Sequence, residues 1–129
     1  MAKKLKRNYI QLVEGKKDDG TPILETYLTP HHISLDVWYE AVDAMEELEK
    51  LEEDNAKSEN PKSMSILMKE QMDILMDVVL NIYDKQFDKK KLRAGLHAPS
   101  VIEDLTQQVQ FIAAGQQDDE TKKFVASLN

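Results

Sequence analysis

The sequence predicts an α+β fold that is mainly α, with an N-terminal β-hairpin followed by a small helical bundle. Two β-prone runs near the N-terminus flank a loop rich in turn residues. From residue 34 onward, apolar residues recur at helical spacing between breaks that contain Pro or Gly. The 129 residues suit one domain with a modest core. We expect the hairpin over 1–30, the bundle over 34–115, and a mobile, frayed helical tail over 116–129.

Composition narrows the class of protein. The formal net charge is -7, and an acidic balance disfavours general binding to a phosphate backbone. The chain has no cysteine, which excludes disulfides, thiolate catalysis and cysteine metal sites. It has no signal-peptide pattern and no run of roughly 18 apolar residues that could span a bilayer. We therefore expect a soluble intracellular protein with no membrane contact.

The hairpin is predicted from two runs, YIQLV (9–13) and ILETYL (23–28), separated by EGKKDDGTP. A lone hairpin is marginally stable in water, so it must pack on the bundle or pair with another chain. Lysines and an arginine cluster around it, which is typical of a protected edge strand; a nucleic-acid-binding arm is the alternative. These residues are Lys3, Lys4, Lys6, Arg7, Lys16 and Lys17.

A first long helix is predicted from Leu35 to Asp54, with Ser34 as its N-cap. One face is apolar: Val37, Trp38, Ala41, Ala44, Met45, Leu48 and Leu51. The opposite face is acidic: Glu40, Asp43, Glu46, Glu47, Glu49 and Glu53. Such a face is either solvated or a surface for a basic partner. A polar linker over 55–65 follows.

A second helix is predicted over 62–83, and it carries a row of methionines. Met64, Met68, Met72 and Met76 advance around the helix by roughly 40° at each step. The apolar arc is wider than on an ordinary surface helix, so the helix is either central or partly devoted to another subunit. Methionine is flexible and polarisable, as adaptable binding surfaces require. The row is therefore either core packing or a contribution to partner binding.

The segment FDKKKLRAGLHAPSVIEDLTQQVQFIAAGQ (87–116) predicts a short helix, a break and a longer helix. Asp88 is expected to cap the short helix, which extends to Ala94, and Gly95 to take the left-handed position after it. Pro99 suits the first turn of the next helix, and Gly115 its end.

This outline is typical of a helix-turn-helix, but its second helix has no Lys or Arg with which to read DNA. A transcriptional regulator is therefore only an alternative hypothesis. No catalytic or metal-binding motif accompanies His31, His32 or His97. We expect no enzyme activity, no cofactor and no metal.

With DNA binding and catalysis disfavoured, binding to another protein is the remaining hypothesis. Phe111 lies about 140° from the centre of the apolar stripe on its helix. It is therefore either buried by a second layer or exposed for a partner. We predict partner-binding residues Met68, Met72, Met76 and Phe111. A structural adaptor or oligomerisation module is a further alternative.

The stretch IYDKQFDKKKLRAGLHAPSVIEDLTQQVQFIAAGQ (82–116) resembles tail assembly chaperones of long-tailed phages and prophages of Gram-positive bacteria. The likeness is carried by the Tyr83–Phe87 pair, the GLHAP corner at 95–99 and the Phe111…Gly115-Gln116 ending. The stretch that contains these motifs is about a quarter of the chain. The resemblance implies a non-enzymatic protein of the host cytoplasm that binds the tape measure protein and helps recruit major tail protein. It also implies a frameshifted longer form, of which this chain would be the shorter version. We also expect self-association, because it would hide the same apolar surface before the client arrives.

Overall fold

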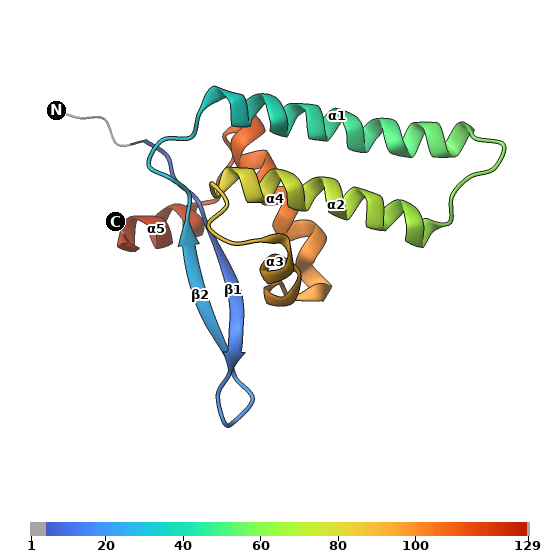
Figure 1. Ribbon diagram of the computed structural model, residues 1–129. Helices are drawn as coiled ribbons and strands as arrows, with labels where there is room; N and C mark the ends of the chain where they lie inside the picture. Colours follow the sequence, from blue (N-terminus) through green and yellow to red (C-terminus); the bar gives the residue numbers. More distant parts are fainter. Residues whose placement is uncertain (1–4, 129) are drawn as a thin grey trace.

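A computed structural model describes residues 5–128 and confirms the α+β, mainly α fold (Figure 1). The elements in chain order are β1 (Tyr9–Lys16), β2 (Pro22–Leu28), α1 (Leu35–Lys57), α2 (Met64–Ile82), α3 (Lys89–Gly95), the 3-10 helix η1 (Ala98–Ser100), α4 (Val101–Ala114) and α5 (Asp119–Leu128). Lys3 and Lys4, expected to belong to the basic cluster, lie outside the described residues.

The hairpin is antiparallel, with Tyr9 opposite Leu28 and a bulge between Val13 and Gly15. Its connecting turn contains Gly20 at φ 87°, a left-handed conformation that glycine adopts without steric cost. One face of the hairpin is buried and contributes to the core, so it packs on the bundle as a two-stranded sheet requires. The buried strand residues are Ile10, Leu12 and Tyr27.

α1 and α2 form an antiparallel helical hairpin that is longer than any other pair of elements (Figure 1). α1 continues to Lys57, about one turn beyond its expected end. α2 begins at Met64 rather than 62, because Ser63 caps it by accepting a hydrogen bond from the Ile66 amide. Beyond α2, Asp84 and Lys85 adopt positive φ, and the Lys85 amide donates to the Leu80 carbonyl, which closes the helix end.

Gly95 is not in the left-handed conformation predicted for it. It is the last residue of α3, and the positive-φ glycines among the described residues are Gly20 and Gly115. Gly95 is instead required by a close approach: a Cβ at this position would lie 2.7 Å from the Cβ of Leu12. Gly115, at φ 67°, does end α4 as expected.

The main core lies where the hairpin, α2, α3 and α4 meet. Its fully buried side chains include Leu12, Val79, Ile82, Tyr83, Leu92, Leu105 and Val109. Phe87, in the connection between α2 and α3, links the hairpin to the end of α2: its ring centroid lies 4.9 Å from that of Tyr27 in β2 and 5.6 Å from that of Tyr83 after α2. Aromatic pairs at these distances contribute about 0.5–1.5 kcal/mol beyond the area they bury.

The C-terminal segment, expected as a mobile tail, contains α5. Asp118 caps this helix by accepting a hydrogen bond from the Thr121 amide at 2.7 Å. The Phe124 ring lies 4.4 Å from the Tyr9 ring, and Val125 is buried. α5 therefore packs beside the start of β1 (Figure 1).

Candidate partner-binding surface

The far half of the α1–α2 hairpin projects beyond α3 and α4 (Figure 1). The exposure of the methionines of α2 increases along the helix toward this projecting end. Met76 is 4% exposed, Met72 is half-buried, Met68 is 44% exposed and Met64 is 70% exposed. The methionine row predicted from the sequence is therefore core at one end and surface at the other.

The exposed methionines lie on the same side of the α1–α2 pair as α4. α4 contacts that side at the opposite end of the pair, near Trp38 and Tyr83. Trp38 Nε1 of α1 donates to the Ala113 carbonyl at 3.1 Å, and Tyr83, which follows α2, donates to Gln108 of α4 at 2.6 Å. Met72 precedes Tyr83 by eleven residues, about three full turns, so it points toward the same side.

Met45 continues this surface on α1. It follows Trp38 by seven residues, about two turns, and is 41% exposed. Met45, Met64, Met68 and Met72 thus lie on one side of the α1–α2 hairpin, and we call this surface the methionine patch. Met45 lies nearer the base of the hairpin than Met64 and Met68, because the hydrogen bonds Asn81–Glu40 and Gln71–Glu52 place it level with about Met76. Sequence periodicity placed Met45 on the apolar face of its helix. It could not predict that the side chain is partly exposed in the fold.

The other two predicted binding residues are buried in the free chain. Phe111 is 5% exposed and Met76 is 4% exposed. The alternative of an exposed Phe111 is therefore wrong for this conformation, and its helical offset reflects a second layer of packing. Of the four predicted residues, the structure brings Met68 and Met72 together at the surface.

A strong negative charge lies beside the methionine patch. α1 contains nine carboxylates and two lysines, a net charge of -7, which equals that of the whole chain. Glu40 accepts a hydrogen bond from Asn81, and Glu52 accepts one from Gln71. Among residues 5–128, no ion pair joins an α1 carboxylate to a basic side chain.

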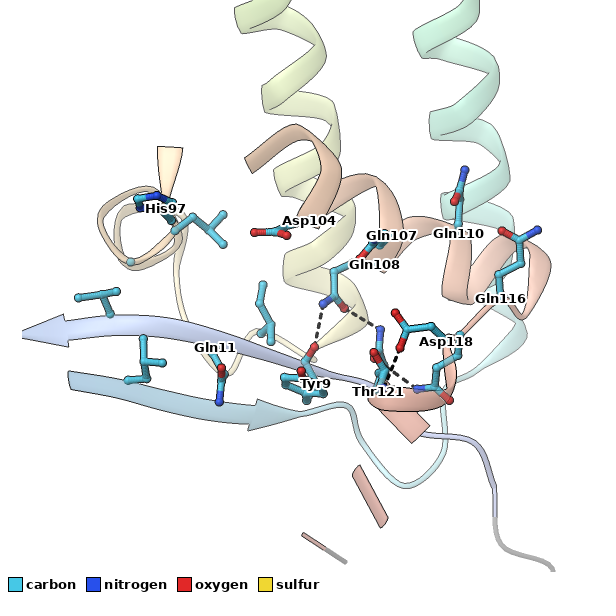
Figure 2. Close-up of a pocket in the computed structure, with 17 residues that line it drawn as sticks. Tyr9, Gln11, His97, Asp104, Gln107, Gln108, Gln110, Gln116, Asp118 and Thr121 are labelled. Atoms are coloured by element: carbon cyan, nitrogen blue, oxygen red, sulfur yellow. Dashed lines mark hydrogen bonds between the residues drawn. The ribbon is translucent and has the colours of Figure 1, made fainter. Parts of the chain in front are cut away.

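A polar pocket of about 470 Å³ lies between β1, α4 and the start of α5 (Figure 2). Amide side chains dominate its lining, and Figure 2 shows Gln107 and Gln108 of α4 and Gln116 around it. His97 and Asp104 stand at its other end. The pocket is an open depression without a convergent set of charged groups, so its chemistry is hydrogen bonding.

Gln108 forms the buried wall of this pocket and joins the hairpin to the bundle. Its Oε1 accepts from Tyr83 Oη at 2.6 Å and from Asn8 Nδ2 at 3.2 Å. Its Nε2 donates to the Tyr9 carbonyl at 2.8 Å. Gln117 adds a second link by donating to the Arg7 carbonyl at 2.7 Å. Among the described residues, no buried side-chain N or O atom lacks a partner, as a stable polar network requires.

Sequence reasoning missed the role of Gln108, although a signal was present. Gln108 lies three residues after Leu105 and next to Val109, within the apolar stripe of its helix. An amide in an apolar stripe is expected to be buried and therefore hydrogen-bonded. The sequence could indicate that partners exist, but not that they come from a strand about 100 residues away.

Burial also perturbs two tyrosines of this region. Desolvation raises the pKa of Tyr83 well above its ordinary value, and the hydrogen bond to Gln108 offsets this only in part. Partial burial raises the pKa of Tyr9, and the nearby carboxylate of Asp118 adds to the effect. Tyr83 therefore stays protonated as a hydrogen-bond donor at neutral pH.

Two basic side chains of the corner between α3 and α4, Lys89 and Lys91, form ion pairs within the molecule. Lys91 pairs with Glu14 at 2.7 Å and with Glu25 at 3.4 Å, which ties α3 to the hairpin. Lys89 pairs with Asp73 and Asp77 of α2. α4 faces inward through Leu105 and Val109. The segment that outlined a helix-turn-helix is thus a packing corner in this fold.

No group of three or more His, Asp or Glu side chains in residues 5–128 is arranged to hold a metal ion. His31 and His32 are exposed in the connector before α1, and His97 is exposed at the start of η1. None of the helices of the described chain is both long and apolar enough to cross a bilayer.

The described chain is a small helical bundle with a packed β-hairpin and an exposed apolar patch, an architecture typical of small protein-binding modules. The family model described as phage tail chaperone protein matches residues 4–129. The chain therefore belongs to the phage tail chaperone family, as the resemblance of residues 82–116 indicated. No curated protein and no solved structure matches the chain.

Proposed function

We propose that this tail chaperone binds the tape measure protein and assists tail tube assembly, as a non-enzymatic protein of the host cytoplasm. The observation that carries the proposal is the methionine patch. Met64 and Met68 are 70% and 44% exposed on a helix whose other end is core. Exposed apolar side chains gathered at one place mark a site of interaction.

The patch suits a helical client. α1 and α2 lie side by side as an antiparallel pair, so a third helix can pack across both with its apolar face toward the methionines. Unbranched methionine side chains adapt to clients of varied sequence. A long helical protein bound in this way would have its own apolar face shielded from aggregation until the tail assembles.

The residues that we assign to client contact differ from the four predicted from the sequence. Met68 and Met72 are accessible in the free chain, with Met45 and Met64 added by the fold. Met76 and Phe111 are buried side chains, 4% and 5% exposed. We therefore assign client contact to the methionine patch and stability to Met76 and Phe111.

Self-association would cover the same surface before the client arrives, and major tail protein would be recruited to the complex afterwards. Two copies joined at this patch would also bring two acidic α1 helices together. We therefore expect any such contact to be weak. Sedimentation velocity should show an association that strengthens with protein concentration and with salt.

Co-expression with the tape measure protein of the same phage tests the proposal. The double variant Met45→Glu/Met68→Glu adds charge to the patch without touching the core, and it should leave the tape measure protein insoluble. Ile102→Glu is the matched control, since Ile102 is 51% exposed on α4, outside the patch. Circular dichroism confirms folding of each variant. Unchanged solubility of the tape measure protein with the double variant would contradict the proposal.

A further inference from the structure

The rim of the methionine patch is charged differently on its two helices. On α1, Glu49, Glu53 and Glu46 lie within about 100° of Met45, on the side that faces away from α2. All three are exposed. On α2, the exposed Lys69 follows Met68 and borders the opposite edge of the patch. The patch thus has one acidic edge and one edge with a basic residue.

Within residues 5–128, no ion pair neutralises the acidic edge. Three basic side chains near the hairpin and the linker pair with carboxylates outside α1: Lys89 with Asp73 and Asp77, Lys91 with Glu14 and Glu25, and Lys62 with Glu70. Within the described chain, no such pair reaches α1. Like charges concentrated on one helix repel each other, so a cationic partner would relieve a cost that the free chain bears.

We propose that the occupant of the methionine patch is a cationic amphipathic helix, whose lysines and arginines lie along the α1 edge. This inference rests on the proposed function and specifies the chemistry of the client segment. The patch extends along α1 from Met45 to the end of the helix at Lys57, about 18 Å, which matches roughly twelve residues of a bound helix. The client segment therefore needs about three turns with an apolar stripe and a basic flank.

Charge complementarity favours this occupant over a second copy of the chain. A second copy would bring another α1 helix of net charge -7 to the same edge. A cationic helix instead meets carboxylates that are exposed and that form no ion pair with any basic side chain of residues 5–128. Opposite charge also speeds the encounter, and a rim of this kind selects partners more strongly than it adds affinity.

Two fluorescent 18-residue peptides test the inference by anisotropy with the full chain. They share one leucine stripe and differ only in carrying Lys or Glu at every polar position. We expect the Lys peptide to bind about tenfold more tightly than the Glu peptide near 50 mM salt, with the difference shrinking as salt rises. Equal affinities for the two peptides, or binding of neither, would overturn the inference.

Two triple variants locate the effect on α1. Glu46→Gln/Glu49→Gln/Glu53→Gln should weaken the Lys peptide by about tenfold, since three exposed charge contacts are lost. Asp43→Asn/Glu47→Gln/Asp54→Asn removes the same charge from the face about 160–180° away from Met45 and should change affinity less than about threefold. Equal losses from the two triples would show only the effect of net charge and would overturn the inference.

Two variants also distinguish a failure of this inference from a failure of the proposed function. If Met68→Glu abolishes binding of both peptides while the Glu46/Glu49/Glu53 triple has no effect, the patch binds helices without regard to charge. The inference would then be wrong and the proposed function would stand. A stable dimer through the patch that the Lys peptide does not displace would overturn the inference in favour of a second copy.

Discussion

The backbone of Gly95 lies directly against the side chain and backbone of Leu12. A Cβ on Gly95 would lie 2.7 Å from the Leu12 Cβ and 3.3 Å from both the Leu12 Cα and the Val13 amide nitrogen. Leu12 is fully buried, so it cannot move aside. Glycine at this position is what allows the end of α3 to rest on β1.

Gly95→Ala should therefore destabilise the fold. The added methyl meets backbone atoms of β1, and overpacking of this kind costs about 1–3 kcal/mol. The free energy of unfolding from urea titration should fall by that amount. The helical propensity of alanine acts in the opposite direction by up to about 1 kcal/mol, so the observed loss is a net value.

Gly15→Ala is the matched control. A Cβ at Gly15 would have no neighbour nearer than 4.0 Å, and this glycine does not have positive φ. Its free energy of unfolding should stay within about 0.5 kcal/mol of the parent chain. A Gly95→Ala chain as stable as Gly15→Ala would show that α3 can shift away from β1 without cost.

Gly95 also shows which parts of the fold local sequence patterns can predict. The hairpin, the long helices and the helix end at Gly115 follow from spacing, caps and turn residues, because each depends on neighbours within a few positions. Gly95 was assigned to the wrong conformation because helices commonly end at a left-handed glycine. Its actual requirement comes from Leu12, a contact across 83 positions that no local pattern contains.

Gln108 supports a second prediction about stability. Gln108→Leu would keep the volume of the side chain but leave Tyr83 Oη, Asn8 Nδ2 and the Tyr9 carbonyl without their present partner. Each buried polar group left unpaired costs about 1–3 kcal/mol, so the loss should exceed 2 kcal/mol in denaturant unfolding. The β-hairpin amides should also lose hydrogen-exchange protection first, since this network fastens them to the bundle.

Gln107→Leu serves as the control on the neighbouring position. Gln107 is exposed and donates only to Glu103, at 3.4 Å, so its replacement should change stability by less than about 0.5 kcal/mol. Equal losses at 107 and 108 would refute a special role for the buried network.

The candidate site was predictable in part, for a related physical reason. The spacing of Met68, Met72 and Met76 correctly placed a methionine row on one helix. Periodicity describes the direction of a side chain, whereas exposure depends on where the covering helix stops. Met76 is buried in the core and Met68 is 44% exposed, and that boundary is set by the tertiary arrangement. The same limit explains why Phe111 could not be assigned to core or surface from its angle alone.

Tyr83 makes stability depend on alkaline pH. Burial holds the pKa of its phenol well above 10.0, the ordinary value that applies in the unfolded chain. Between these two pKa values the unfolded chain has lost the proton and the folded chain keeps it. The free energy of unfolding should therefore be unaffected by this group below about pH 9, then fall by up to about 1.4 kcal/mol per pH unit above 10.

Tyr83→Phe isolates this contribution, because phenylalanine cannot ionise. Urea titrations from pH 8 to 11 should give a shallower decline for the variant, although its stability at pH 8 is lower through loss of the bond to Gln108. Lys91, whose pKa is raised to about 12 mainly by Glu14, contributes a decline of the same sign in both chains. Parallel curves for the two chains would contradict the assignment to Tyr83.

The methionine row should divide into residues that stabilise the fold and residues that do not. Met76 is 4% exposed, so Met76→Ala leaves a cavity and should cost about 2–5 kcal/mol of unfolding free energy. Met68 is 44% exposed, and Met68→Ala should cost no more than about 0.5 kcal/mol. The two substitutions remove the same atoms from one helix, two turns apart, so each controls for the other.

If the patch is a client surface, Met68→Ala should also reduce the amount of tape measure protein that co-purifies while leaving the melting curve unchanged. Equal destabilisation by the two variants would mean that the projecting hairpin is packed in solution, and that its methionines are not available to a client.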